Sequence, residues 1–165
     1  MWAPCFEPEI KLTGTLKGWA RKPCLWTLTA RGSKQQPGVV FALDKAQRTS
    51  CHGLILKIAK SRLETDLLNL WRREMPAGLY KPTWLPVTTA TKEIMALCFA
   101  VNHDHKLFIK RISKNNLIYA IANAHGEYGT CLDYYQKTLS SLNKLGLEDN
   151  YIHELTTAAV AKSSV

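Results

Sequence analysis

The sequence contains no long apolar run. Its 165 residues are 46% hydrophobic, but the longest apolar stretches are broken by Lys, Asp or His within a few positions. A membrane-spanning helix needs about 20 consecutive apolar residues, so no segment is expected to cross a bilayer. The start of the chain, Met1-Trp2-Ala3-Pro4-Cys5, also lacks the basic residues and apolar centre of a signal peptide. No membrane-spanning segment and no signal peptide are therefore expected.

Closely spaced cysteine pairs are absent as well. The five cysteines are odd in number, widely spread, and form no C-x-x-C motif. This pattern argues against a disulfide framework and against a zinc site, and it predicts free thiols in a reducing cytoplasm. Cys24 and Cys131 are candidates for a nucleophile beside a histidine, although free cysteines are more often buried core residues.

The basic residues do not cluster. Lys and Arg number 22 against 13 Asp and Glu, which gives a formal net charge of +9. Such a surplus is compatible with nucleic-acid binding. However, no five basic residues follow one another, and neither an RNA-binding aromatic motif nor a helix-turn-helix pattern accompanies them. A small anionic substrate is therefore the preferred partner, and no nucleic acid is expected.

Runs of β-branched, aromatic and aliphatic residues predict several short strands. They are expected over residues 12–19, 24–29, 39–43, 53–58, 83–89 and 94–101. Pro23, Asp44 and a polar link over residues 46–50 are expected to interrupt the first four. The last strand is apolar on both faces and should lie in the middle of the fold. Short strands with regular turns indicate a curled sheet or a small barrel.

Helical periodicity begins after residue 60. Ser61 and Glu64 have the spacing of a capping box, in which two side chains satisfy free backbone N–H groups. The helix that starts there carries an apolar stripe, expected to be buried, of Leu63, Leu67, Leu70 and Trp71. In the C-terminal third, one helix is expected to be capped by Ser113 and to end near Gly126, and a second to be capped by Thr130 and to end at Gly146. A last helix is expected over residues 151–161, followed by a frayed tail over residues 162–165. This order indicates a single α+β domain over residues 1–165, and not an alternating βαβ fold.

The first predicted helix ends in a charged and aromatic stretch, residues 70–80. Glu74 is placed where the last helical turn meets a loop, a position from which side chains often act. A carboxylate beside Trp71 and Tyr80 that is partly desolvated has a raised pKa and can serve as a base near neutral pH. The alternative is a solvated charge paired with a neighbouring arginine, as most helix-end carboxylates are.

Other candidate sites are less specific. Residues 102–105, Asn-His-Asp-His, offer metal-ligating side chains, but no third ligand is evident and no metal site is expected. Residues 126–129 lack the Lys-Ser/Thr of a phosphate-binding loop. Tyr134 and Tyr135 point about 100° apart in a helix, so one can pack in the core while the other reaches a pocket.

Several short motifs, each weak alone, occur in a characteristic order along the chain. They are Arg31-Gly32 with Pro37-Gly38, Cys51-x-Gly53, Arg73-Glu74, Tyr80-x-Pro82-x-Trp84, Ala96-Leu97-x-Phe99, Gly126 and Gly129 before Asp133-Tyr134, and Leu145-Gly146-Leu147-x-Asp149. In this order the chain resembles the ChaC-type γ-glutamylcyclotransferases, from Trp2 to about Leu155. The resemblance implies an α+β fold with a small mixed β-barrel flanked by helices. It also implies cleavage of glutathione, or of another γ-glutamyl peptide, to 5-oxoproline and the remaining peptide, without a metal or an organic cofactor.

The resemblance implies roles for four residues. In the family, the substrate's own α-amine attacks its γ-carbonyl, and the glutamate of the Arg-Glu pair carries the proton to the leaving nitrogen; Glu74 occupies that position. Tyr134 matches a tyrosine that lines the γ-glutamyl pocket, and Tyr80 lies where another aromatic hydroxyl borders it. Arg31 is a candidate for binding a substrate carboxylate. Helix packing for Tyr134 and a turn-stabilising charge for Arg31 are the alternatives.

One family motif does not occur in the sequence. Family members carry a Tyr-Gly-Ser-Leu turn after their first strand, whose backbone N–H groups hold the γ-glutamyl group. This turn would fall immediately before Met1-Trp2-Ala3-Pro4. Two expectations follow: translation starts upstream, or the chain is an N-terminally truncated, inactive relative that lacks its first strand and serves as a binding or remnant domain. Lys106 also stands where the family usually has proline, and no consequence is assigned to it.

Overall fold

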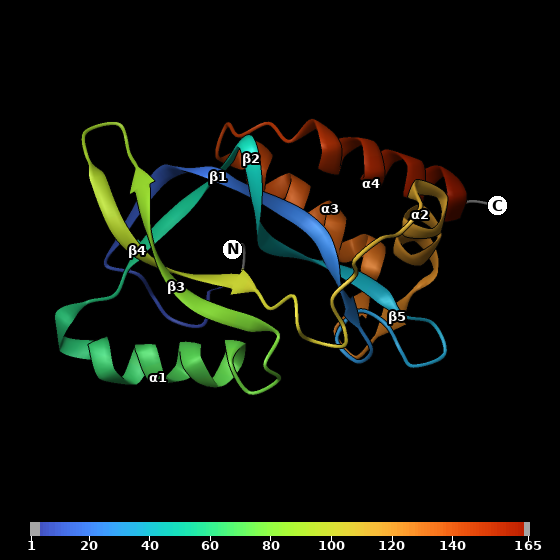
Figure 1. Ribbon diagram of the computed structural model, residues 1–165, viewed down its shortest axis with the longest axis horizontal. Coiled ribbons are helices and arrows are strands. Elements are labelled where there is room, and N and C mark those ends of the chain that lie inside the picture. The colour runs from blue at the N-terminus through green and yellow to red at the C-terminus, as the bar shows by residue number, and fades with distance from the viewer. Residues whose placement is uncertain (1–3, 164–165) are drawn as a thin grey trace. The chain divides into compact units, whose positions relative to one another are not determined.

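The computed structural model describes residues 4–163. Its elements, most of them labelled in Figure 1, are β1 (Ile10–Thr27), β2 (Gly38–Lys57), η1 (Lys60–Arg62), α1 (Leu63–Glu74), β3 (Tyr80–Thr88), β4 (Glu93–Val101), α2 (Lys114–Asn123), β5 (His125–Gly126), β6 (Gly129–Thr130), α3 (Cys131–Lys144) and α4 (Asn150–Ser163). Long strands precede the first helix and the remaining helices come last, which confirms the α+β class. Within residues 4–163 no helix is long and apolar enough to cross a membrane, and α3 and α4 have 14 residues each.

The long strands form a closed barrel in the order β1-β2-β4-β3. β2 and β4 are parallel, with Leu43 opposite Ala100, whereas β3 pairs antiparallel with both β4 and β1. The barrel is therefore mixed, as the resemblance implies. β5 and β6 form a separate two-stranded hairpin.

The chain divides into two compact units. Unit 1 contains the chain up to Lys22 together with Ala42–His105, and unit 2 contains Pro23–Phe41 together with the chain from Lys106 onward. β1 and β2 each contribute residues to both units. α1, β3 and β4 belong to unit 1, whereas α2, α3 and α4 belong to unit 2. The expectation of a single domain stays a prediction.

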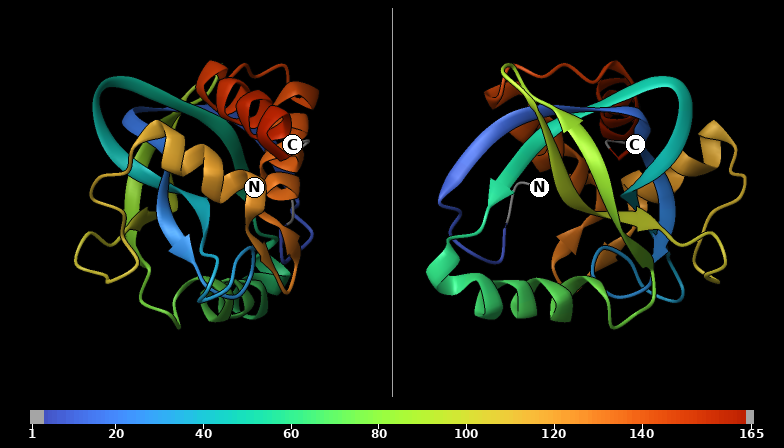
Figure 2. Two further views of the ribbon diagram at one scale, coloured as in Figure 1. Left: turned by 90° about the vertical axis from the view of Figure 1, so that its right-hand side faces the viewer. Right: turned by 60° about the vertical axis from the view of Figure 1, so that its left-hand side comes forward.

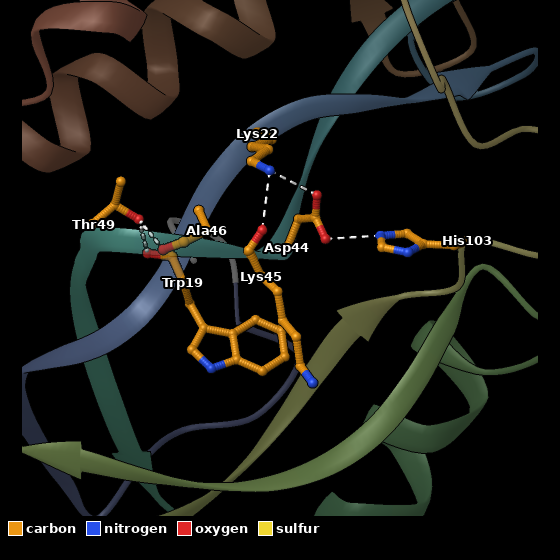
Figure 3. A network of polar contacts seen from close by, with 7 residues as sticks. All are labelled: Trp19, Lys22, Asp44, Lys45, Ala46, Thr49 and His103. Atoms are coloured by element: carbon orange, nitrogen blue, oxygen red, sulfur yellow. Dashed lines mark hydrogen bonds and ion pairs between the residues drawn. The ribbon is translucent and has the colours of Figure 1, made fainter.

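The number of strands in the first half of the chain was predicted wrongly. One strand, β1, covers the two ranges expected before residue 30, and β2 runs through Asp44 and the expected polar link at 46–50. Gly18 in β1 and Arg48 in β2 have φ values of +78° and +60°, so each strand bends at these residues without ending. Thr49 stabilises the second bend, because its hydroxyl lies 2.7 Å from the carbonyl oxygen of Ala46 (Figure 3).

The start and the packing of α1 also differ from the prediction. The helix is preceded by η1, and no side chain caps its N-terminus, so Ser61 and Glu64 do not form a capping box. The predicted apolar stripe is not buried either, since Leu63 and Trp71 are 49% and 41% exposed. The one buried residue of α1 is Asp66. Apolar periodicity indicated the helix correctly, but it did not determine which face the helix buries.

β4 is less buried than its sequence suggests. It lies between β2 and β3, but in a closed barrel every strand has two neighbours, so the predicted position in the middle of the fold is not confirmed. Met95 is 55% exposed, and only Ala100 and Val101 are buried. A barrel strand has one face toward the interior, which is why apolar residues on both faces did not mean burial on both faces.

Unit 2 has an apolar core between its helices, as the sequence predicts. Figure 2 shows α2, α3 and α4 beside one another, and α2 packs against both of the others. Ser113 and Thr130 cap α2 and α3 by accepting hydrogen bonds from the backbone N–H groups of Asn116 and Asp133. Gly146, after α3, has a φ of +66°. The two caps and the glycine end at Gly146 are confirmed, because they depend on local sequence. The glycine end near Gly126 is not: α2 ends at Asn123 before an extended Ala124, and Gly126 belongs to β5.

Candidate active site

Glu74 is the last residue of α1, where the sequence places it. Its side chain is only 12% exposed, and its Oε1 lies 3.3 Å from Nε of Arg73. Burial raises the pKa of Glu74, and the positive charge of Arg73 opposes that rise. The partial negative charge at the C-terminal end of a helix acts in the same direction as burial, because it disfavours a carboxylate. Glu74 is therefore not a solvated surface charge but a half-buried carboxyl with raised basicity.

A short turn connects Glu74 to Tyr80 within unit 1. The N–H of Met75 continues the helix by donating to the carbonyl of Trp71, and the N–H of Gly78 donates to the carbonyl of Met75 (3.0 Å). Gly78 has a φ of +66°, the left-handed region that favours glycine. Tyr80 then starts β3, opposite Val101 on β4, and is half-buried. The two predicted residues of unit 1 thus flank a turn of defined shape.

The segment Asn102–His105, which follows β4, makes hydrogen bonds to several parts of unit 1. Asn102 donates from Nδ2 to the carbonyl of Gly78, at 3.0 Å. Asp104 forms an exposed ion pair with Lys81, at 2.8 Å. In the part of the chain that the structure describes, no three His, Cys, Asp or Glu side chains are grouped as metal ligands would be. The polar side chains of this segment bind neighbouring strands and the turn after α1.

A buried carboxylate of β2 binds this segment (Figure 3). Oδ1 of Asp44 lies 2.8 Å from Nε2 of His103, and its Oδ2 accepts a hydrogen bond from Nζ of Lys22 at 2.9 Å. Lys22 also donates to the carbonyl of Lys45. Burial alone would raise the pKa of Asp44, but the hydrogen bonds and charges of Lys22 and His103 outweigh it and lower the pKa. This pairing explains why β2 continues through Asp44, where the sequence predicts its end.

Arg31, in unit 2, is buried and has acidic and carbonyl partners. Its Nη1 donates to Oδ2 of Asp133 at 2.9 Å and to the carbonyl of Thr130 at 3.3 Å. Its guanidinium carbon lies 5.9 Å from the centre of the Tyr134 ring. The structure therefore brings together Arg31 and Tyr134, two residues that are 103 positions apart in the sequence.

The glycines of the family-like motifs surround Arg31 for a steric reason. A Cβ atom added at Gly32 would lie 2.1 Å from the backbone nitrogen of Gly38, and one added at Gly126 would lie 2.2 Å from the carbonyl oxygen of Thr29. Gly129 has a φ of +104°, and a Cβ there would lie 3.2 Å from Nη1 of Arg31. Only glycine permits this close approach of the loop that carries Arg31 to the β5–β6 hairpin.

The adjacent tyrosines of α3 have different environments, as predicted. Tyr135 is fully buried, whereas Tyr134 is half-buried. The hydroxyl oxygen of Tyr134 accepts a hydrogen bond from the N–H of Phe41 at 3.2 Å. Tyr134 thus has the packing role that the sequence leaves open, and its role toward a substrate stays a prediction.

The buried cysteines are poor candidates for nucleophiles. Cys131 is fully buried, and burial raises the pKa of its thiol to about 11, although a backbone hydrogen bond from Val39 and the charge of Arg31 lower it in part. A thiol with this pKa is protonated near neutral pH and therefore unreactive. Cys24 is buried as well. Both residues instead fill the interior of unit 2.

The sequence did not indicate the roles of Asn102 and Asp44. Asn102 and its partner Gly78 are separated by 24 positions, and Asp44 and His103 by 59. Polar residues at the end of an apolar strand suggest loop contacts, but they do not reveal which distant residue is bound. The family's Tyr-Gly-Ser-Leu turn would precede Met1, and Met1–Ala3 lie outside the described residues.

Comparison with solved structures defines the class of fold. Two crystal structures of a glutathione-specific γ-glutamyl cyclotransferase from yeast resemble this chain, one of them from selenomethionine-labelled protein. The alignment with the labelled structure has a TM-score of 0.85 and 15% sequence identity. It covers 97% of this chain and 90% of the yeast chain. The other has a TM-score of 0.84 and 13% identity and covers 97% and 93%. At this identity the likeness establishes the fold, which is that of the γ-glutamylcyclotransferases.

Sequence comparison identifies the family. The family described as ChaC-like protein matches residues 1–162. The glutathione-specific γ-glutamylcyclotransferase of Escherichia coli strain K12 is 33% identical over 156 residues, which cover 94% of this chain and 67% of that protein. The chain belongs to the ChaC-like family.

Proposed function

We propose that this protein is a glutathione-specific γ-glutamylcyclotransferase, which converts glutathione to 5-oxoproline and Cys-Gly. The observation that carries the proposal is the half-buried carboxyl of Glu74, whose pKa is raised by burial. Membership of the ChaC-like family and the similarity to the E. coli enzyme support it. The five free cysteines suit a reducing cytoplasm, where glutathione is abundant.

Glu74 acts as the base and then as the acid. Its carboxylate takes a proton from the α-ammonium group of glutathione, and the resulting amine attacks the γ-carbonyl carbon. A C–N bond forms to close the five-membered lactam, and the bond to the cysteine nitrogen breaks. Glu74 gives this proton to the departing nitrogen, which leaves as an amine, so the carboxylate is regenerated. The lactam nitrogen releases its second proton to water, and the free amine of Cys-Gly takes up one proton from water, so the protons balance. A carboxylate with a raised pKa is a stronger base for the first step, while Arg73 keeps it ionised.

The enzyme's other task is to hold the substrate in a folded conformation. The nucleophile belongs to glutathione, so the reaction is intramolecular and requires neither a metal nor an organic cofactor. Positioning of this kind can contribute a large part of the rate. We propose Tyr80, Tyr134 and Arg31 as substrate-binding residues; Arg31 would serve a substrate carboxylate while Asp133 holds its guanidinium in place. No nucleic-acid partner is proposed.

The test is release of 5-oxoproline from glutathione by the purified chain, measured by chromatography. We expect Glu74→Gln to abolish release, because an amide cannot accept the ammonium proton. Glu64→Gln is the matched control, since Glu64 is an exposed glutamate in the first turn of the same helix, and its substitution should leave the rate unchanged. An undiminished rate for Glu74→Gln would eliminate the role assigned to Glu74.

The inactive-relative hypothesis makes a distinct prediction. An inactive binding domain would produce no 5-oxoproline at any enzyme concentration and would show no difference between Glu74→Gln and the parent chain. Family membership and the 33% identity to an enzyme support the catalytic alternative.

A further inference from the structure

The turn after α1 is held from outside by Asn102. The Nδ2 atom of Asn102 donates to the carbonyl of Gly78 at 3.0 Å, and its backbone N–H donates to the carbonyl of Leu79 at 2.8 Å. Two consecutive carbonyls of the turn are thus bound by one residue. Gly78 is the residue of this turn with left-handed backbone geometry. The two hydrogen bonds hold its carbonyl and the next one, so they fix the path of the chain between Glu74 and Tyr80.

The orientation of the Asn102 side chain is set by its own segment. Its Oδ1 accepts a hydrogen bond from the N–H of Asp104 at 3.2 Å, and its carbonyl accepts one from the N–H of His105 at 3.1 Å. The side chain at this position must therefore donate a hydrogen bond to the Gly78 carbonyl and accept one from the N–H of Asp104. An amide meets both needs, whereas a carboxylate would place an oxygen against the Gly78 carbonyl.

The segment that carries Asn102 is itself fixed to the barrel. His103 binds the buried carboxylate of Asp44, which also binds Lys22 of β1, as Figure 3 shows. The Asp44 carboxylate is buried, whereas the side chains of His103 and Lys22 are 55% and 39% exposed, so the segment is fixed through the Asp44 end of these bonds. The Asp104–Lys81 pair is exposed on both sides and contributes little. Asn102 is therefore supported by a rigid part of unit 1.

From these contacts we propose that Asn102 is a positioning residue for Glu74. Its hydrogen bond to Gly78 holds the turn in the shape that keeps the carboxyl of Glu74 half-buried at the end of α1. Asn102 does not touch the reacting atoms; it acts through the turn. This inference rests on the proposed function only for its effect on turnover, since the environment of Glu74 exists without a substrate.

Among the described residues, the Glu74 carboxyl has a charged neighbour on its own helix, and two titratable residues lie on the turn and the segment that follow it. Arg73, on the same helix, is its ion-pair partner. From the turn and the following segment come Tyr80, at the start of β3, and His105, whose Cδ2 would lie 3.9 Å from a Cβ at Gly78. Loss of the Asn102 bond leaves these groups in the chain but loosens the turn that sets their distances from Glu74.

The experiment compares pH–rate profiles of the parent chain and two variants. Burial places the acid limb of the kcat profile above the ordinary pKa of glutamate, because activity is lost as pH falls through the raised pKa of the base. In Asn102→Leu and Asn102→Ala, which remove the hydrogen bond without adding a charge, the turn relaxes and water reaches Glu74, so the acid limb moves to lower pH. We expect kcat to fall about tenfold or more, since small displacements of a reacting group are costly, and KM to change less.

The control is Asp104→Asn, which removes the exposed ion pair from the same segment. It should leave the pH of the acid limb unchanged and kcat within about twofold of the parent value. If Asn102→Ala does not fold, Asn102→Leu carries the test, because leucine is close to asparagine in shape and adds no charge. A uniform loss of rate with an unmoved acid limb would show a merely structural role and overturn the proposal, as would a parent-like profile.

A second measurement separates this inference from the proposed function. The pKa of Glu74 is followed by carboxyl-carbon NMR in the parent chain and in Asn102→Leu, which adds no charge, without substrate. A lower Glu74 pKa in the variant supports the positioning role even if the chain proves inactive toward glutathione. An unchanged pKa refutes that role even if Glu74→Gln abolishes turnover.

Discussion

At the scale of single residues, the environment of a side chain decides its chemistry. Glu74 and Glu64 are both glutamates of α1, at its last and first turns. Glu64 is exposed, whereas the side chain of Glu74 is 12% exposed and its pKa is raised by burial. The partial negative charge at the C-terminal end of a helix also disfavours the anion of Glu74. The same residue type is therefore a surface charge at one end and a candidate base at the other.

The hydroxyl of Tyr134 is expected to stabilise the folded protein as an acceptor. In Tyr134→Phe the N–H of Phe41 loses its side-chain partner, which should lower the free energy of unfolding by about 1 to 2 kcal/mol, as for other hydrogen bonds in partly buried positions. Urea unfolding measures the change. Tyr128→Phe is the matched control, because Tyr128 is 72% exposed. Equal stability of the two variants would show that the Phe41 N–H does not need this oxygen.

At the scale of elements, the position of Glu74 depends more on the turn between α1 and β3 than on the packing of either element. α1 buries little of its apolar surface, and its end is held by the turn and by Asn102. β3 begins directly after that turn, in register with β4. The position of Glu74 therefore depends on the backbone of a few loop residues supported by a barrel strand, and the packing of the helix contributes less.

Gly78→Ala is expected to reduce turnover through this turn. A Cβ at Gly78 would meet only His105, at an ordinary 3.9 Å, so the cost comes from φ alone, about 1 to 2 kcal/mol. To relieve this strain the turn must change shape and displace Glu74, and kcat should fall about tenfold or more. Thermal unfolding and 5-oxoproline release give the two quantities.

Gly146→Ala is the control for the Gly78 variant. Gly146 has the same φ of +66°, a Cβ there would meet nothing within 4 Å, and it lies in unit 2 after α3. Its substitution should cost a similar stability and leave kcat unchanged. A similar loss of kcat in both variants would mean that strain lowers activity without involving the turn.

At the scale of the whole molecule, the two compact units differ in how deeply their cysteines are buried. Cys24 and Cys131 are buried and belong to unit 2. Cys5, Cys51 and Cys98 are half-buried and belong to unit 1. Burial raises the pKa of Cys131 to about 11 and also raises that of Cys98, so the thiols differ both in access and in thiolate content. Thiol chemistry therefore reports on each unit separately.

Labelling with a disulfide reagent at pH 8 is expected to modify the thiols of unit 1 first. At that pH a thiol with a pKa of about 11 is ionised in roughly one molecule per thousand, and only the thiolate reacts, so Cys131 should stay unlabelled until urea opens unit 2. Mass spectrometry of peptides identifies the labelled positions, and Cys5 serves as the internal reference. Labelling of Cys131 as fast as Cys5 in the native protein would contradict its burial.

Local features of the fold could be read from the sequence. The caps Ser113 and Thr130, the end at Gly146 and the order of strands and helices depend on residues within one or two turns of each other, so the sequence predicts them correctly. The capping box at Ser61 was mispredicted because η1 precedes α1. The end of a strand at Asp44 was mispredicted because this residue is buried against His103, 59 positions away.

The sequence by itself determined the family resemblance, the α+β class and the place of Glu74 at the end of a helix, since each follows from residue order and local periodicity. Only the tertiary structure decided how far Glu74 is buried, that Asn102 binds the turn and that Arg31 pairs with Asp133. The last two contacts join residues 24 and 102 positions apart. The physical reason is that the pKa and hydrogen-bond partners of a side chain depend on the atoms packed around it, and these come from distant parts of the chain.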